Sequence, residues 1–91
     1  MSTLVHSTRL ASAKQDAANI GAAIELLKLE GRYDPDDDHL FYLVCEKSGI
    51  VFAGNISEMN ADGGFIYTLN VGGTLYVVRY DAATGIADEV A

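Results

Sequence analysis

The residues that decide the fold are FIYTLNVGGTLYVVRY, at positions 65–80. Two runs rich in β-branched and aromatic residues, 65–71 and 74–80, flank the pair Gly72-Gly73, which suits the positive φ angles of a two-residue hairpin turn. Such a hairpin places three pairs of facing residues on one side, which we expect to be the core side: Phe65 with Tyr80, Tyr67 with Val78 and Leu69 with Tyr76.

Upstream of this hairpin, two shorter runs also have the composition of strands. The runs 40–46 and 50–55 flank Lys47-Ser48-Gly49, which is typical of a tight hairpin connection. The sequence therefore predicts a second antiparallel pair of strands before the main hairpin. Cys45 lies in the apolar part of the first run, so we expect a buried and inert thiol.

A last strand is predicted at the end of the chain. The segment 81–85 resembles a longer hairpin loop, and the run 86–90 after it is short and partly apolar. Asp88 and Glu89 would discourage this strand from pairing with another sheet edge. The strands together form an antiparallel β-meander of four to five strands.

The N-terminal third of the chain predicts a helix over about residues 8–30. Ser7 is its expected N-cap, with Ser2 or Thr3 as earlier alternatives, and Gly31 is placed to end it in the left-handed conformation. Apolar residues recur at steps of three and four, which aligns them on one helix face: Leu10, Ala13, Ala17, Ile20, Ile24 and Leu27. We expect a single α+β domain, 1–91, in which this helix packs on the core side of the meander.

Two other faces carry more apolar residues than solvent-facing surfaces usually do. On the helix these are Ala11, Ala18, Ala22, Leu26 and Leu29; on the outer side of the sheet they include Leu75 and Val77. One interpretation is that a partner or a second copy of the chain covers the helix face, so a homodimer is open. The other is that Leu26 and Leu29 pack under a loop while the alanines only favour the helix.

The charge of −7 is unevenly distributed along the chain. Residues 1–33 hold three acidic and four basic side chains, whereas residues 34–91 hold ten acidic side chains and only two basic ones. An acidic surface of this kind repels nucleic acid and anionic lipid and attracts basic protein surfaces. We therefore expect no direct nucleic-acid or membrane partner, although solubility alone would also explain the charge.

No motif for catalysis, phosphate binding or zinc binding is present in the sequence. The run 34–39, DPDDDH, invites a metal site, but the sixth and twelfth places of an EF-hand loop would hold His39 and Cys45 instead of Gly and Glu. We expect no enzyme activity, no metal and no cofactor. The N-terminus lacks the features of a secretion signal and no apolar run is long enough for a membrane span, which predicts a cytoplasmic protein.

Two resemblances extend these expectations. The segment 13–33, AKQDAANIGAAIELLKLEGRY, resembles the helix end of type IV pilins and of the major pseudopilins of type II secretion, in which the helix leads into an antiparallel sheet. This resemblance implies a structural head domain. In kind, a short, acidic, non-enzymatic α+β chain is similar to small phage-encoded inhibitors such as anti-CRISPR and DNA-mimic anti-restriction proteins, which implies stoichiometric inhibition in the host cytoplasm.

The hypothesis that we prefer from the sequence is an inhibitor of a basic nucleic-acid-binding protein, such as a CRISPR effector complex. Its expected acidic contacts are Asp34, Asp36, Asp37, Asp38, Glu58 and Asp62. Its expected apolar contacts are Leu26, Leu29, Leu75 and Val77. The alternatives are the pilin-like structural domain and a protein of a mobile element that binds a small ligand, which would require a deep pocket with converging titratable groups.

Overall fold

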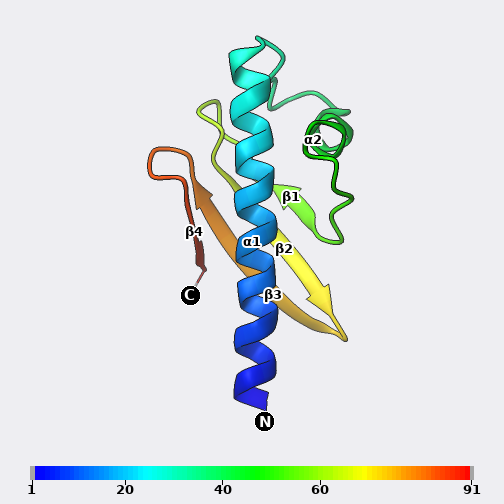
Figure 1. The fold of residues 1–91 in the computed structure, drawn as a ribbon, viewed down its shortest axis with the longest axis vertical. Helices are drawn as coiled ribbons and strands as arrows, with labels where there is room; N and C mark the ends of the chain where they lie inside the picture. The colour runs from blue at the N-terminus through cyan, green and yellow to red at the C-terminus, as the bar shows by residue number, and fades with distance from the viewer. Residues whose placement is uncertain (1, 91) are drawn as a thin grey trace.

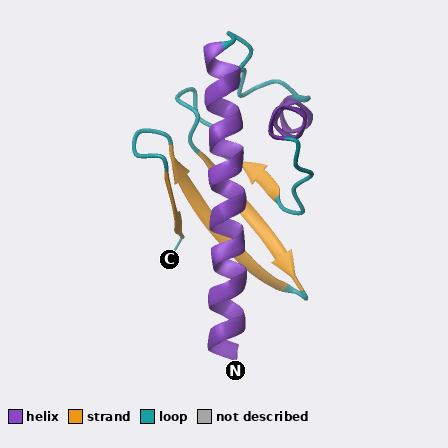
Figure 2. Cartoon of the chain, in the orientation of Figure 1, coloured by secondary structure: helices purple, strands orange, loops and turns teal. Residues whose placement is uncertain are grey.

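The computed structural model describes residues 2–90, and these form two helices and one four-stranded antiparallel sheet. The elements are α1 (Ser2–Leu29), α2 (Leu40–Ser48), β1 (Asn55–Ser57), β2 (Phe65–Val71), β3 (Thr74–Asp81) and β4 (Ile86–Glu89). The strands lie in the order of the chain, and α1 crosses one face of the sheet while α2 packs beside its C-terminal half (Figures 1 and 2). The predicted α+β class with a helix on a β-meander is confirmed.

The predicted hairpin across Gly72-Gly73 is present. Both glycines have positive φ, 60° and 88°, and the register of β2 and β3 is the expected one. The three predicted pairs face each other, and all six side chains are buried on the side that α1 covers: Phe65, Tyr67, Leu69, Tyr76, Val78 and Tyr80. Alternation over two seven-residue runs thus identifies the core face of the sheet.

The core forms where the apolar stripe of α1 meets this sheet face. The buried helix residues include most of the predicted stripe: Ala13, Ala17, Ile20, Ile24 and Leu27. The helix lies close to the sheet at Gly21, where an added Cβ would lie 2.2 Å from Cζ of Tyr80. The ring of Tyr80, which stacks on Phe65, therefore occupies the space that a side chain at this position would need.

Helix α1 begins earlier than its expected N-cap. It starts at Ser2 instead of near Ser7, because no Gly or Pro interrupts residues 2–8. The Thr8 hydroxyl donates to the Leu4 carbonyl (2.9 Å) from a position inside the helix. Its end is as predicted. Gly31 has a φ of 70°, and the Arg32 amide donates to the Leu27 carbonyl (2.8 Å), which closes the helix in a Schellman arrangement.

The predicted strands 40–46 and 50–55 are wrong. Residues 40–48 form α2, which buries Leu40 and Val44, one helical turn apart, and ends at Gly49 in the left-handed conformation. Nine residues rich in Phe, Tyr and Val fit a strand as well as a helix, so the i, i+4 spacing and the terminal glycine outweigh β propensity here. The next segment pairs with β2 only from Asn55 onward.

Tyr67 joins three segments that are distant in the sequence. Its side chain is fully buried, and its hydroxyl donates to Oδ2 of Asp16 on α1 (2.9 Å) while accepting the amide of Gly54 (2.9 Å). Gly54 has to be glycine, since a Cβ would lie 2.5 Å from both the Thr68 carbonyl and the Tyr67 ring. Burial, with the Asp16 hydrogen bond adding to it, raises the pKa of Tyr67 to about 12.

Replacing this phenol tests the network directly. We expect Tyr67→Phe to lower the free energy of unfolding by about 1–3 kcal/mol, because the Gly54 amide loses its acceptor inside the protein. Chemical denaturation at neutral pH measures this loss. Tyr42→Phe is the matched control, since the hydroxyl of Tyr42 is exposed and makes only a 3.5 Å contact with Glu46. Equal stability of the two variants would contradict the assigned role.

The raised pKa of Tyr67 predicts that the stability of the fold depends on pH, and Tyr67→Phe tests this as well. The folded pKa of Tyr67, about 12, exceeds the unfolded value of about 10. The stabilisation from the protonated phenol is therefore complete below about pH 10 and is lost as the pH rises towards 12. Wild type should lose more stability across this interval than Tyr67→Phe does.

Candidate protein-binding surface

Two acidic loops, 34–38 and 58–62, meet at the C-terminal end of α1. The hydroxyl of Tyr33 donates to the Asn60 carbonyl (2.5 Å), and Lys28 Nζ donates to the Asp62 carbonyl (2.7 Å). Burial raises the pKa of Tyr33, and the nearby carboxylates of Asp62 and Asp34 raise it further. The structure thus brings Asp34 and Asp62, 28 positions apart in the sequence, to the same tyrosine.

The basic side chains at this end are already paired with other acids. Lys28 contacts Glu25 (3.0 Å), and Glu30 contacts both Arg32 (3.2 Å) and Lys47 (2.6 Å). The hydrogen bond from Lys47 is the main cause that lowers the pKa of Glu30. These pairs leave the neighbouring loops with an excess of negative charge.

The predicted acidic contacts divide into two kinds within residues 34–62. Asp34 and Asp37 hold the loop: Oδ1 of each accepts the amide two residues later, at 2.9 Å. Asp37 also lies 3.6 Å from Nδ1 of His39. Asp62 holds the second loop in the same way, because its Oδ1 accepts the Gly64 amide (2.9 Å). The other three are exposed and have no cation within 4.0 Å among the described residues: Asp36, Asp38 and Glu58. These three carboxylates are free to meet a partner.

An apolar surface continues from this acidic end. The outer side of α2 and the segment after it expose Phe41, Tyr42 (65 %), Ile50 and Val51 (91 %), and the exposed side chains of α1 add Leu26 and Leu29 (84 %). We call these six side chains the α2 surface. An open groove of about 460 Å³ crosses it between Phe41, Tyr42 and Val51, and a smaller one of about 250 Å³ joins Leu26 to Ile50.

The structure excludes one of the two interpretations of the helix face. Leu26 and Leu29 do not pack under a loop; both side chains are exposed. The other two predicted apolar contacts are elsewhere, because Leu75 and Val77 lie on the outer side of the sheet, with Leu75 exposed and Val77 half-buried. Leu26 lines the groove that reaches Ile50, and Leu29 is exposed about one turn further along α1.

Sequence reasoning misses the aromatic part of the α2 surface. The wrong strand prediction covers Phe41, Tyr42, Ile50 and Val51, and the signal that could have found them is the helical spacing of Leu40 and Val44 before Gly49. Cys45, expected to be buried, is half-buried and lines the larger groove with Glu46.

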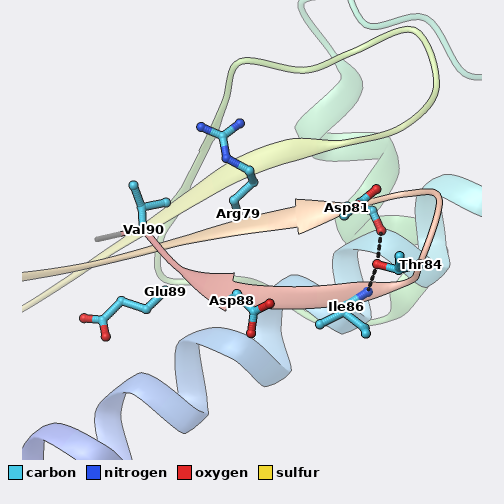
Figure 3. Close-up of a pocket in the computed structure, with 7 residues that line it drawn as sticks. All are labelled: Arg79, Asp81, Thr84, Ile86, Asp88, Glu89 and Val90. Carbon is cyan, nitrogen blue, oxygen red and sulfur yellow. Dashed lines mark hydrogen bonds between the residues drawn. The ribbon is translucent and has the colours of Figure 1, made fainter.

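A third groove lies over β3 and β4, at the opposite edge of the sheet. It is open, holds about 520 Å³, and is lined by Arg79, Asp81, Thr84, Ile86, Asp88, Glu89 and Val90 (Figure 3). Asp81 and Thr84 are engaged in the turn, because Asp81 Oδ1 accepts the Ala83 amide (2.9 Å) and Thr84 Oγ1 accepts the Ile86 amide (3.3 Å).

Two kinds of feature are absent from residues 2–90: a cluster of metal-ligating side chains and a helix able to cross a membrane. No group of three His, Cys, Asp or Glu side chains there is arranged to hold a metal ion. Neither helix in this part of the chain has the length and apolar character that crossing a bilayer requires. No protein-family model, no curated protein and no solved structure matches the chain. Its surface chemistry is therefore the basis for a functional assignment.

The exposed position of the α2 surface predicts how its residues respond to substitution. We expect Val51→Ser to change the free energy of unfolding by less than about 0.5 kcal/mol, as for other solvent-exposed positions. Val44→Ser, on the inner side of α2, should cost about 2 kcal/mol or more, because it leaves a void and buries a hydroxyl. Urea denaturation compares the two, and similar losses would show that Val51 is not exposed in solution.

Proposed function

We propose that this chain is a non-enzymatic protein-binding domain that occupies a basic surface of its partner, as a stoichiometric inhibitor does. The observation that carries the proposal is the exposed α2 surface, most of which follows directly in the chain after the 34–38 loop, where Asp36 and Asp38 have no cation within 4.0 Å among the described residues. Proteins seldom expose so many large apolar side chains together unless another molecule covers them.

The two parts of the surface have different roles in binding. Asp36, Asp38, Glu58 and Asp62 attract a basic partner and speed its approach, an effect that salt weakens. Phe41 and Tyr42 are the expected anchors, because aromatic side chains in the centre of an interface contribute most of the binding energy. The partner therefore needs an apolar pocket bordered by lysine or arginine residues.

A CRISPR effector complex is one class of partner with the required charge. Such complexes hold the guide and target strands in a positively charged channel. The carboxylates of Asp36 and Asp38, which have no cation within 4.0 Å among the described residues, support binding at the rim of such a channel, where they would compete with nucleic acid. The charge supports any basic nucleic-acid-binding complex in the same way, so a test requires complexes of several types.

A structural domain of a larger assembly is the second candidate. The first turns of α1 extend past the end of the sheet (Figure 1), and Leu4 (74 %) and Val5 are exposed there. Helix packing through this segment would bury both side chains. We expect Leu4→Ser/Val5→Ser to abolish any oligomer seen by light scattering, and unchanged assembly in this variant would contradict the candidate.

Competition with nucleic acid tests the first proposal. Guide-loaded CRISPR effector complexes of several types are bound to fluorescent target DNA, and the purified protein is titrated in while anisotropy is measured. We expect DNA release from at least one complex, with an end point at a fixed molar ratio. Asp36→Asn/Asp38→Asn should raise the protein concentration needed for half-release about tenfold or more. Phe41→Ser/Tyr42→Ser should raise it by a similar factor.

The charge-preserving variant Asp36→Glu/Asp38→Glu is the matched control and should compete nearly as well as wild type. If no complex releases DNA, this class of partner is wrong. If the asparagine variant competes as well as wild type, the acidic loop has no role in binding.

A further inference from the structure

The edge strand β4 is a second candidate binding site, separate from the α2 surface. It pairs with β3 on one side only, and in Figure 1 it lies on the opposite side of α1 from α2. The groove of Figure 3 runs beside it, with Ile86, Asp88 and Val90 contributed by β4 and the residue after it. Binding at this edge would be independent of the function proposed for the α2 surface.

The backbone of β4 offers hydrogen-bonding groups on its outer side. The Val90 amide donates to the Val77 carbonyl (2.9 Å), which makes 77 and 90 a hydrogen-bonded pair. Alternation along the antiparallel register then directs the backbone groups of Ile86 and Asp88 toward β3 and those of Ala87 and Glu89 outward. A further strand could use these outward groups.

Carboxylates stand on both faces of this edge. Asp88 projects on the outer face of the sheet, and Arg79, although opposite it in register, points its guanidinium elsewhere (Figure 3) and forms no ion pair with it. Glu89 projects on the α1 face, where Oε2 lies 3.8 Å from Nε2 of His6. Ile86 is exposed beside Asp88 on the outer face.

The two carboxylates of β4 determine which kind of segment can pair with this edge. A second copy of β4 would bring four carboxylates together across one strand pair, and like charges in facing positions destabilise a sheet. A segment with two adjacent basic residues would instead place one cation on each face, one near Asp88 and one near Glu89. An apolar residue on the outer face would pack in the groove against Ile86.

We propose that β4 accepts an extended segment of another protein, with adjacent lysine or arginine residues flanked by β-branched residues, as a fifth strand of the sheet. Main-chain hydrogen bonds to Ala87 and Glu89 supply the affinity and the two carboxylates supply the selectivity.

Nuclear magnetic resonance of the full chain tests this proposal with a synthetic probe. The peptide acetyl-Thr-Val-Thr-Lys-Lys-Val-Thr-Val-amide is titrated into the ¹⁵N-labelled protein. We expect the largest shift changes in residues 86–90, and slower exchange of the Ala87 and Glu89 amides. Asp88→Asn/Glu89→Gln should weaken binding about fivefold or more, whereas Asp36→Asn/Asp38→Asn should not.

A control peptide separates strand addition from charge attraction. It carries N-methyl groups at the amides that would face β4 and keeps both lysines, so it can attract the carboxylates but cannot form the ladder. We expect it to lose binding. Equal binding of both peptides, shift changes centred on the 34–38 loop, or no binding of the parent peptide would each overturn the proposal, and none would affect the DNA-competition result.

Discussion

The hydroxyl of Tyr67 is the contact on which the arrangement of the molecule depends. It lies in the centre of the sheet and is bonded to Asp16 of α1 and to the amide of Gly54. The first bond fixes the helix against the sheet, and the second holds the segment that leads from α2 into β1. Since Gly54 has no side chain, this segment approaches β2 closely enough for the bond to form.

The exposed surface is a consequence of this arrangement. With Gly54 held in place, Phe52 lies in the core and Val51 before it faces solvent, while α2 buries Leu40 and Val44 and turns its aromatic side outward. The Tyr33 hydrogen bond to Asn60 then brings the second acidic loop to the same end of α1. The two acidic loops therefore meet at the C-terminal end of α1 through a contact at the surface, and the first of them leads directly into α2.

The predictable parts of the structure are those with long, regular patterns. Sixteen residues with alternating large side chains around Gly72-Gly73 define the β2–β3 register, and Gly31 marks the end of α1. In contrast, α2 has only nine residues, whose composition favours a strand, and its helical spacing covers a single turn. The six predicted acidic contacts are exposed or half-buried, as solvated loop residues usually are. That their two loops lie together depends on hydrogen bonds from Tyr33 and Lys28, which no local sequence pattern reveals.

The outward position of Phe41, Tyr42 and Val51, with Tyr67 buried in the core, is the feature on which the proposed function depends. Paramagnetic relaxation of side-chain protons by a soluble gadolinium chelate measures this directly in the free protein. We predict strong relaxation for the methyl groups of Val51 and the ring of Tyr42, and little for Val44 and Tyr67. Protection of Val51 and Tyr42 to the same degree as Val44 would contradict this position.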